Sequence, residues 1–268
     1  MRLLTILFLA SLGGAAGAAD IILQSTTSTA NSDLYDHLLP RFEEASGIKV
    51  NDVAVGTGQA LRNAANCDGD VLLLHAKPAE EKFVADGGGV ERFDVMYNDF
   101  VIVGPQDDPA GIAGLDDVRT ALKRIADAEV IFASRGDDSG THRNERGLWE
   151  MAGIDPTPAS GHWYRETGSG MGATLNAGIG MGAYVMTDRA TWITFGNTQD
   201  YRVHVEGDPA LFNQYGVMLV NPERCANVRA EEGQALVDWL VSEEGQDAIA
   251  SHAKRGRQLF FPNARKAK

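Results

Sequence analysis

Three short segments rich in Ser, Thr and Gly each stand where a predicted strand ends and a predicted helix begins. They are residues 25–29 (STTST), 56–59 (GTGQ) and 134–141 (SRGDDSGT). The first N–H groups of a helix have no partner inside the helix, and the helix dipole adds positive potential at that end, so an anion can bind there. Each segment alone is better explained as an ordinary helix N-cap, because Ser and Thr are preferred caps. Three of them in one chain favour an anion site.

The segment 134–142, SRGDDSGTH, gives the strongest indication. Arg135 offers a planar fork of donors that matches an oxyanion, and its permanent charge suits a dianion. The alternative is that Arg135 pairs with Asp137 or Asp138 on the loop surface, where an ion pair adds little to stability. The hydroxyl groups that could bond the oxygens of the anion are those of Ser28, Thr57, Ser139 and Thr141.

The pattern around these segments predicts an open α/β sheet. Short apolar runs at residues 21–24, 47–55 and 71–75 are typical of strands, and the last is apolar throughout, as in a strand buried on both faces of a parallel sheet. Leu34 and Leu38 recur at helical spacing between the first two strands. Strands that alternate with helices form such a sheet, and ligands bind at the carboxyl ends of its strands.

The alternation recurs in the second half of the chain, and no low-complexity linker separates the two halves. We expect a strand over residues 95–103 to cross between two lobes, so that the C-terminal segment completes the first lobe. The predicted division is a signal peptide at 1–19, a first lobe made of 20–104 and 205–268, and a second lobe at 105–204. Within these lobes we predict helices at 118–126, 143–152 and 231–253, strands at 130–133 and 216–220, and a tight turn before a helix at 167–172.

The N-terminus predicts secretion. Arg2, an apolar run over residues 3–12 and small residues ending at Ala19 have the layout of a cleaved signal peptide, and the run is too short to span a bilayer. No cysteine follows the run to carry a lipid. We therefore expect a periplasmic protein.

Composition narrows the class of partner. The 268 residues are 44% hydrophobic and 23% charged, which is ordinary for a globular protein, and the formal net charge is −13. Such a charge argues against nucleic acid as a partner, because those contacts need Lys and Arg to neutralise phosphates.

Cysteine and histidine usage gives one prediction about bonding and one about metals. Cys67 and Cys225 are the two cysteines of the chain, and in an oxidising compartment we expect them to form a disulfide. The six histidines show no spacing typical of metal ligands, so no metal site and no cofactor are predicted.

Taken together, the motifs resemble those of the tungstate-binding periplasmic proteins of ABC transporters, over nearly the whole mature chain. They are STTST at 25–29, VGTGQAL at 55–61, VMYNDFVIVGP at 95–105, SRGDDSGTH at 134–142, WYRETGSGMG at 163–172 and AYVMTDRATW at 183–192. The chain departs from the family pattern at Ser169 and at residues 178–180, which bears on the closing contacts of the second lobe.

The resemblance implies an α/β fold of the type II periplasmic binding protein class: two lobes, each a mostly parallel sheet flanked by helices, with the ligand in the cleft between them. It implies a monomer that captures tungstate or molybdate and delivers it to an ABC permease in the inner membrane. The implied ligand-binding residues are Thr27, Ser28, Thr57, Arg135, Ser139, Gly140, Thr141 and Thr174.

Two other function classes would use residues of the same segments. A binding protein or sensor for another oxyanion, such as phosphate, sulfate or an organic anion, would use the same site. A secreted hydrolase would need Ser28 or Ser139 as nucleophile and His142 as base, but the sequence lacks a nucleophile elbow and offers no group to orient the base, so we predict no enzyme. Asp188 and Arg189 are expected to form an internal ion pair with each other.

Overall fold

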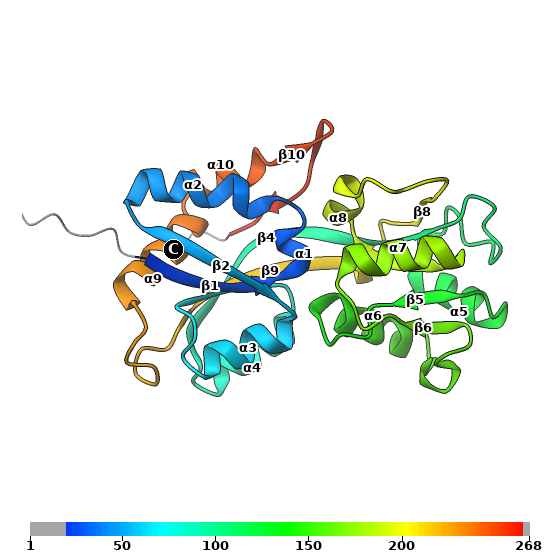
Figure 1. The fold of residues 1–268 in the computed structure, drawn as a ribbon, viewed down its shortest axis with the longest axis horizontal. Helices are drawn as coiled ribbons and strands as arrows, with labels where there is room; N and C mark the ends of the chain where they lie inside the picture. The colour runs from blue at the N-terminus through cyan, green and yellow to red at the C-terminus, as the bar shows by residue number, and fades with distance from the viewer. Residues whose placement is uncertain (1–19, 265–268) are drawn as a thin grey trace, which may run out of the picture.

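The computed structural model describes residues 20–264, so the predicted signal peptide lies outside the described residues. Two lobes stand side by side, each a sheet with helices on its faces (Figure 1). The first half of the chain contains β1 Asp20–Thr26, α1 Thr27–Ala30, α2 Leu34–Ser46, β2 Lys49–Val55, α3 Thr57–Ala65, β3 Val71–Leu74, α4 Lys77–Ala85 and β4 Gly89–Gly104. The α/β fold predicted from the sequence is confirmed.

The second lobe follows β4, and the chain then returns to the first. The second lobe contains α5 Val118–Asp127, β5 Phe132–Ser134, α6 Gly140–Met151, β6 Tyr164–Glu166, α7 Met171–Met181, β7 Tyr184–Asp188, α8 Arg189–Thr194 and β8 Arg202–Val205. The returning segment contains β9 Phe212–Val220, α9 Ala230–Val241, α10 Glu243–Ala250, the short hairpin β10 Ala253–Lys254 and β11 Arg257–Gln258, and β12 Phe261–Pro262.

One strand order, β2-β1-β3-β9-β4-β7-β5-β6, runs through both lobes. Strand β1 is parallel to β2 and β3, and β5 is parallel to β6 and β7. Strands β9 and β4 are antiparallel to their neighbours at the centre. The parallel strands of each lobe therefore end in loops that can carry ligand contacts, while the central pair joins the lobes.

Strands β4 and β9 pass between the lobes (Figure 1). The first part of β4 pairs with β9, from Gly89 opposite Val220 to Asp99 opposite Phe212. From Phe100 onward β4 pairs instead with β7 and β8 of the second lobe. The crossing strand predicted at residues 95–103 is thus the middle of a longer strand. The exact lobe boundaries stay a prediction, and the buried core of the second lobe also contains Val205 and Leu211.

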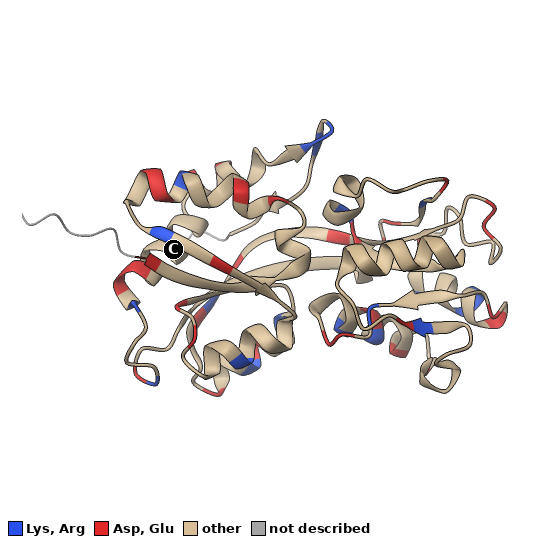
Figure 2. Ribbon diagram, viewed as in Figure 1, with Lys and Arg blue, Asp and Glu red and all other residues tan. Residues whose placement is uncertain are grey.

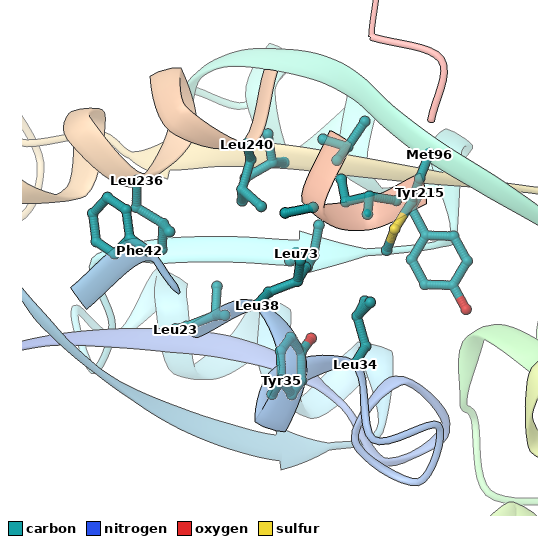
Figure 3. Packing of buried hydrophobic residues seen from close by; sticks show 14 of the residues in the cluster. Leu23, Leu34, Tyr35, Leu38, Phe42, Leu73, Met96, Tyr215, Leu236 and Leu240 are labelled. Atoms are coloured by element: carbon teal, nitrogen blue, oxygen red, sulfur yellow. The ribbon is translucent and has the colours of Figure 1, made fainter. Parts of the chain in front are cut away.

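The core of the first lobe forms where two helices cover the sheet (Figure 3). Leu38 and Phe42 of α2 and Leu236 and Leu240 of α9 lie in one buried cluster with strand residues such as Leu73. The spacing of four between the residues on each helix places them on one face, as predicted for α2. Full burial of each such side chain contributes about 1.5–3 kcal/mol to stability.

The prediction of one long terminal helix over residues 231–253 is wrong. The chain forms two helices, α9 and α10, and Ser242 lies between them with extended backbone. Its Oγ accepts a hydrogen bond from the N–H of Gly245 at 3.2 Å and donates to the carbonyl of Trp239 at 2.7 Å. Serine is a better N-cap than a helix-interior residue, and this competition ends one helix and starts the next.

Cys67 and Cys225 form a disulfide, as predicted. The bond joins the turn after α3 to the loop after β9 across a sequence separation of 158 residues. The Asn227 amide also donates to the Cys67 carbonyl at 2.8 Å. The end of α3 is therefore held against the segment that returns from the second lobe. Within residues 20–264, no helix is both long enough and apolar enough to cross a membrane.

We predict that replacing both cysteines by serine lowers the free energy of unfolding by about 2–5 kcal/mol, because the unfolded chain loses a long-range constraint. Urea denaturation of the variant and the wild type measures the difference. Thiol titration of unfolded, unreduced wild type should find no free thiol, and two free thiols would contradict the disulfide.

Candidate functional site

The three Ser/Thr/Gly segments lie at strand-to-helix junctions, as predicted, but the first is more ordered than expected. Residues 25–29 do not form a loop: β1 runs to Thr26, and Thr27 is the first residue of α1. In the second segment Gly56 is the N-cap of α3. In the third, β5 ends at Ser134 and Ser139 is the N-cap of α6, its Oγ accepting from the N–H of His142 at 3.2 Å.

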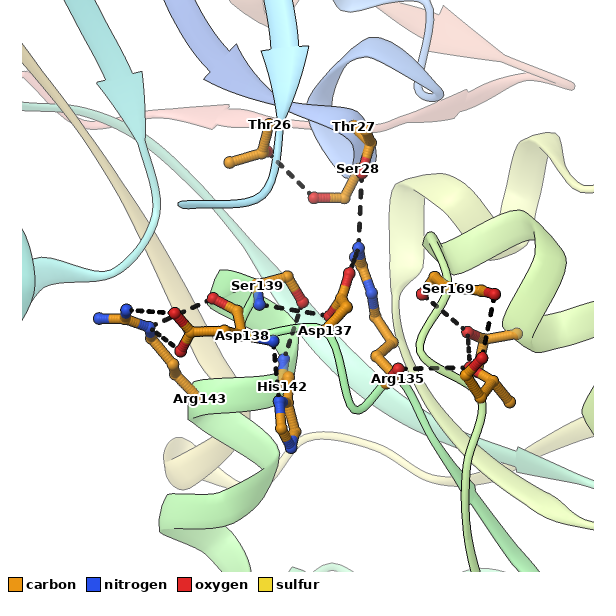
Figure 4. Close-up of polar contacts among 12 residues, drawn as sticks. Thr26, Thr27, Ser28, Arg135, Asp137, Asp138, Ser139, His142, Arg143 and Ser169 are labelled. Carbon is orange, nitrogen blue, oxygen red and sulfur yellow. Dashed lines mark hydrogen bonds and ion pairs between the residues drawn. The ribbon is translucent and has the colours of Figure 1, made fainter. Parts of the chain in front are cut away.

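The junctions of the first lobe meet those of the second. The Arg135 guanidinium approaches Thr27 Oγ1, with 3.4 Å between Nη2 and the oxygen (Figure 4). A Cβ atom added to Gly140 would lie 3.0 Å from Thr57 Oγ1, and one added to Gly170 would lie 3.8 Å from Thr27 Oγ1. The site is therefore built between the lobes from both halves of the chain.

Arg135 is buried at the centre of this arrangement, with 2% of its surface exposed. Its Nη2 donates to Asp137 Oδ2 at 2.5 Å, and the other oxygen of Asp137 accepts from the N–H of Ser139 at 3.2 Å (Figure 4). The ion pair considered as an alternative thus exists, but it is buried rather than on the loop surface. Nε and Nη1 of Arg135 have no hydrogen-bond partner. A buried cation with two unused donors is costly unless a ligand accepts from them.

Two buried hydroxyl groups are also without partners. Thr57 and Thr141 are both fully buried, and neither Oγ1 is hydrogen-bonded. Thr57 opens α3 in the first lobe and Thr141 lies in the first turn of α6 in the second. With Arg135, they supply donors from both lobes.

Two other predicted ligand residues, Ser28 and Thr174, have hydroxyl groups that already have hydrogen-bond partners in the protein. Ser28 Oγ lies 3.1 Å from both Thr26 Oγ1 and His75 Nε2. The Thr174 hydroxyl lies 2.7 Å from Thr167 Oγ1 and donates to the Ser169 carbonyl at 3.1 Å. Thr174 is therefore engaged inside its own lobe, and a ligand role for it stays a prediction.

Helix α7 adds an N-terminus that the ligand set did not include. The N-caps of both α3 and α7 are glycines, Gly56 and Gly170, and neither provides a side-chain cap. The first N–H groups of these helices are thus left for a ligand. The tight turn predicted at 167–172 is present, with Gly168 at φ +61° before α7. The signal that could have revealed this was the glycine at the N-cap position.

His75 was also missed as a site residue. It follows β3 directly, is 4% exposed, and stacks on Tyr215 with 4.9 Å between ring centroids. Burial and, to a lesser extent, the charge of Arg135 lower the pKa of His75 to about 4. The ring is therefore neutral at physiological pH. Its place at the carboxyl end of the third parallel strand was the available signal.

The prediction that Asp188 and Arg189 form an ion pair with each other is wrong. Arg189 pairs instead with Asp99 of β4, with 2.6 Å between Nε and Oδ1, and with Glu206 at 2.7 Å. Asp188 is the N-cap of α8 and accepts from the N–H and the hydroxyl of Thr191 at 2.8 and 2.7 Å. At a strand-to-helix junction the free N–H groups satisfy the carboxylate, so the neighbouring charge is released for a partner elsewhere.

The net charge does not create the site. Asp and Glu are spread over both lobes (Figure 2), and the chain carries a formal charge of −13. An anion between the lobes would therefore have to be attracted by Arg135 and by oriented N–H groups nearby. Among residues 20–264, no three His, Cys, Asp or Glu side chains are grouped so that they could hold a metal ion.

A two-lobed α/β fold whose lobes can close around a ligand is the architecture of periplasmic solute-binding proteins. A family model described as a PBP superfamily domain matches residues 13–244. A tungstate-binding protein named TupA from Peptoclostridium acidaminophilum is 47% identical over 250 residues, which cover 92% of this chain and 86% of that protein.

Two solved structures are also similar. The tungstate-binding protein TupA from Desulfovibrio alaskensis G20 has a TM-score of 0.80 and 43% identity, covering 92% of this chain and all of that one. The structure described as the tungstate ABC transporter from Geobacter sulfurreducens has a TM-score of 0.79 and 45% identity, covering 87% of this chain and 98% of that one. The chain belongs to the PBP superfamily and, within it, to the family of these tungstate-binding proteins.

We predict that Thr57→Val weakens anion binding about tenfold, the loss of roughly one hydrogen bond. The same change should raise the free energy of unfolding of the anion-free protein by about 1 kcal/mol, because it removes a buried hydroxyl that has no partner. Thr29→Val is the matched control: the Thr29 hydroxyl is bonded to Thr26 Oγ1 at 2.8 Å, so its loss should lower stability. A destabilised Thr57→Val protein would show that its hydroxyl is satisfied without ligand.

A second group with a shifted pKa, Glu145, lies close to Ser134, the residue that precedes Arg135. Glu145 of α6 is buried, and the Tyr164 hydroxyl donates to its Oε1 at 2.7 Å and also lies 3.0 Å from Ser134 Oγ. Burial raises the pKa of Glu145 to about 7, although the Tyr164 hydrogen bond opposes the shift. The folded protein therefore holds a proton on Glu145 that the unfolded chain releases near pH 4.5.

It follows that the free energy of unfolding should fall by about 3 kcal/mol as pH rises from about 4.5 to above 7. Glu145→Gln keeps an acceptor for Tyr164 and removes the titration, so this fall should disappear. Glu150→Gln, at an exposed position of the same helix, is the control. Chemical denaturation at pH 5, 6, 7 and 8 makes the comparison, and a slope unchanged by Glu145→Gln would contradict the assignment.

Proposed function

We propose that this protein captures tungstate in the periplasm and delivers it to the ABC permease of the inner membrane. The observation that carries the proposal is a set of buried donors without partners, contributed by both lobes: Nε and Nη1 of Arg135 and the hydroxyls of Thr57 and Thr141. The similar proteins from Peptoclostridium acidaminophilum and Desulfovibrio alaskensis are named tungstate-binding proteins, which supports tungstate as the oxyanion. We keep the predicted ligand set, with Thr27, Ser28, Ser139 and Gly140, as part of the proposal.

The donor set suits an oxyanion that carries no proton. Asp137 could accept from a protonated phosphate, but its two oxygens already receive Arg135 Nη2 and the Ser139 N–H. Asp138 is paired with Arg143, with 2.9 Å between Oδ2 and Nη2. A site lined with donors and with its carboxylates engaged favours tungstate, molybdate or sulfate over a protonated phosphate. Molybdate is the second ligand that we propose, because it has the same charge and shape.

Binding without catalysis is the activity that we propose. Ser28, His75 and Asn213 do form a chain, with 3.1 Å between Ser28 Oγ and His75 Nε2 and 3.2 Å between His75 Nδ1 and Asn213 Oδ1. A pKa of about 4, however, makes His75 a poor base at neutral pH, and an amide rather than a carboxylate stands behind it. His142, the base that a hydrolase would need, accepts a hydrogen bond from the N–H of Asp138 through Nδ1 at 3.1 Å, so this nitrogen is not free to take a proton from a serine.

Delivery to a permease requires two states that the partner can tell apart. The lobes are joined by β4 and β9, so bending of these strands would open and close the cleft. An anion that accepts from both lobes stabilises the closed state, because only there are all its hydrogen bonds made. We propose that the protein acts as a monomer, since each chain supplies both halves of its own site.

Isothermal titration of anion-free protein with tungstate, molybdate, sulfate and phosphate tests the proposal. We expect one-to-one binding that is tightest for tungstate or molybdate. Arg135→Gln should weaken it by about 100-fold or more, because two charge-assisted hydrogen bonds are lost. Arg146→Gln is the control: this arginine pairs with Asp155 on the outer side of α6. An Arg135→Gln protein with unchanged affinity would remove Arg135 from the site, and preferred binding of phosphate would overturn the choice of anion.

A further inference from the structure

His75 lies where three parts of the molecule meet: the first anion junction, the strands between the lobes, and the first residue of α6. Its Nε2 is 3.2 Å from Thr26 Oγ1 and 3.1 Å from Ser28 Oγ. Both hydroxyls belong to the turn that ends β1 and begins α1. The His75 ring therefore supports this turn through Nε2.

The other side of the ring is bonded to the two strands that cross between the lobes. His75 Nδ1 is 3.2 Å from Oδ1 of Asn213 in β9. The amide of Asn213 donates in turn to Oδ1 of Asn98 in β4 at 2.6 Å. This bond turns the Asn213 oxygen toward the ring, so Nδ1 carries the proton and Nε2 is the acceptor that faces Thr26 and Ser28. All three side chains are at most 4% exposed.

The edge of the ring faces the second lobe at Gly140. A Cβ atom at this position would lie 2.9 Å from His75 Cε1, closer than Cβ atoms approach other atoms in proteins, and 3.1 Å from Nδ1, which is tighter than most such contacts. Gly140 is the first residue of α6, the helix whose N-terminus faces the proposed anion. The helix can therefore come this near to the first lobe only because residue 140 has no side chain.

We propose that His75 is the positioning residue that sets how closely the two lobes approach around the anion, by supporting the Thr26–Ser28 turn and stopping α6 at Gly140. The inference rests on the proposed function, since it concerns closure around the same oxyanion. His75 itself does not bind the anion in this scheme. It fixes the separation between donors of the first lobe and those of α6, and so the width of the cavity.

Two variants and their combination test this role. Gly140→Ala should hold the lobes slightly apart, weakening tungstate binding about tenfold or more. His75→Asn keeps a group that can bond Asn213 but removes the part of the ring next to Gly140, and it should also weaken binding. In the double variant the added methyl group has more room. Gly140→Ala should therefore reduce tungstate affinity by a several-fold smaller factor in the His75→Asn background than in the wild type.

Stopped-flow kinetics gives a readout that a general loss of stability would not produce. Because the anion enters before the lobes close, the weaker binding of Gly140→Ala should appear as faster dissociation with nearly unchanged association. Gly147→Ala, on the same helix with nothing within 4 Å of the added atom, is the matched control and should match the wild type. His204→Asn, a buried histidine of the second lobe, controls for the loss of a buried ring.

The outcomes separate this inference from the proposed function. A wild type that binds none of the four anions overturns the proposed function and the inference together. Tight tungstate binding by the wild type, with Gly140→Ala indistinguishable from Gly147→Ala or equally costly in both His75 backgrounds, overturns the role of His75 alone. Should His75→Asn fail to fold, the comparison of Gly140→Ala with Gly147→Ala still decides whether α6 is stopped at this position.

Discussion

The structure depends on hydrogen-bond donors that are buried and left without a partner in the protein. Leaving one such group unsatisfied costs about 1–3 kcal/mol, and Arg135, Thr57 and Thr141 together hold four of them. A protein tolerates this cost when a ligand repays it, and the ligand must accept hydrogen bonds without donating any. In the proposed function, donors on both lobes allow one anion to hold the lobes together, whereas donors on a single lobe would bind the anion without closing the cleft.

Three features support the donors without touching the ligand directly. Asp137 orients Arg135 through one nitrogen and leaves Nε and Nη1 free, so the carboxylate positions the guanidinium while reducing the cost of burying its charge. Glycine N-caps on α3 and α7 leave backbone N–H groups open where a Ser or Asp would occupy them. The third feature is the pair of strands β4 and β9, which connects the lobes by paired backbone, so that bending moves each lobe as a unit.

Much of the fold could be predicted from the sequence because its signals are local. Short apolar runs located β1, β2 and β3, helical spacing of Leu residues located α2, and the strand-to-helix junctions followed from short Ser, Thr and Gly segments. The cysteine pairing followed from the expected compartment and from the presence of two cysteines. The errors arose where a local signal had two outcomes. Ser242 could lie inside a helix or cap a new one, and Arg189 could pair with Asp188 or with Asp99, which is distant in sequence.

The sequence by itself determined the class of fold and the three strand-to-helix junctions, and it singled out Arg135 as the proposed charged donor, because residue type, spacing and helix-end chemistry act over a few residues. Only the tertiary structure decided which donors are free. Thr57 and Thr174 are both buried threonines near helix starts, yet one hydroxyl has no partner and the other is bonded to Thr167 and Ser169. The same holds for His75, whose neighbours Ser28, Asn213 and Gly140 come from three distant segments. Whether a polar group is satisfied depends on atoms brought together by folding, and no spacing along the chain records that.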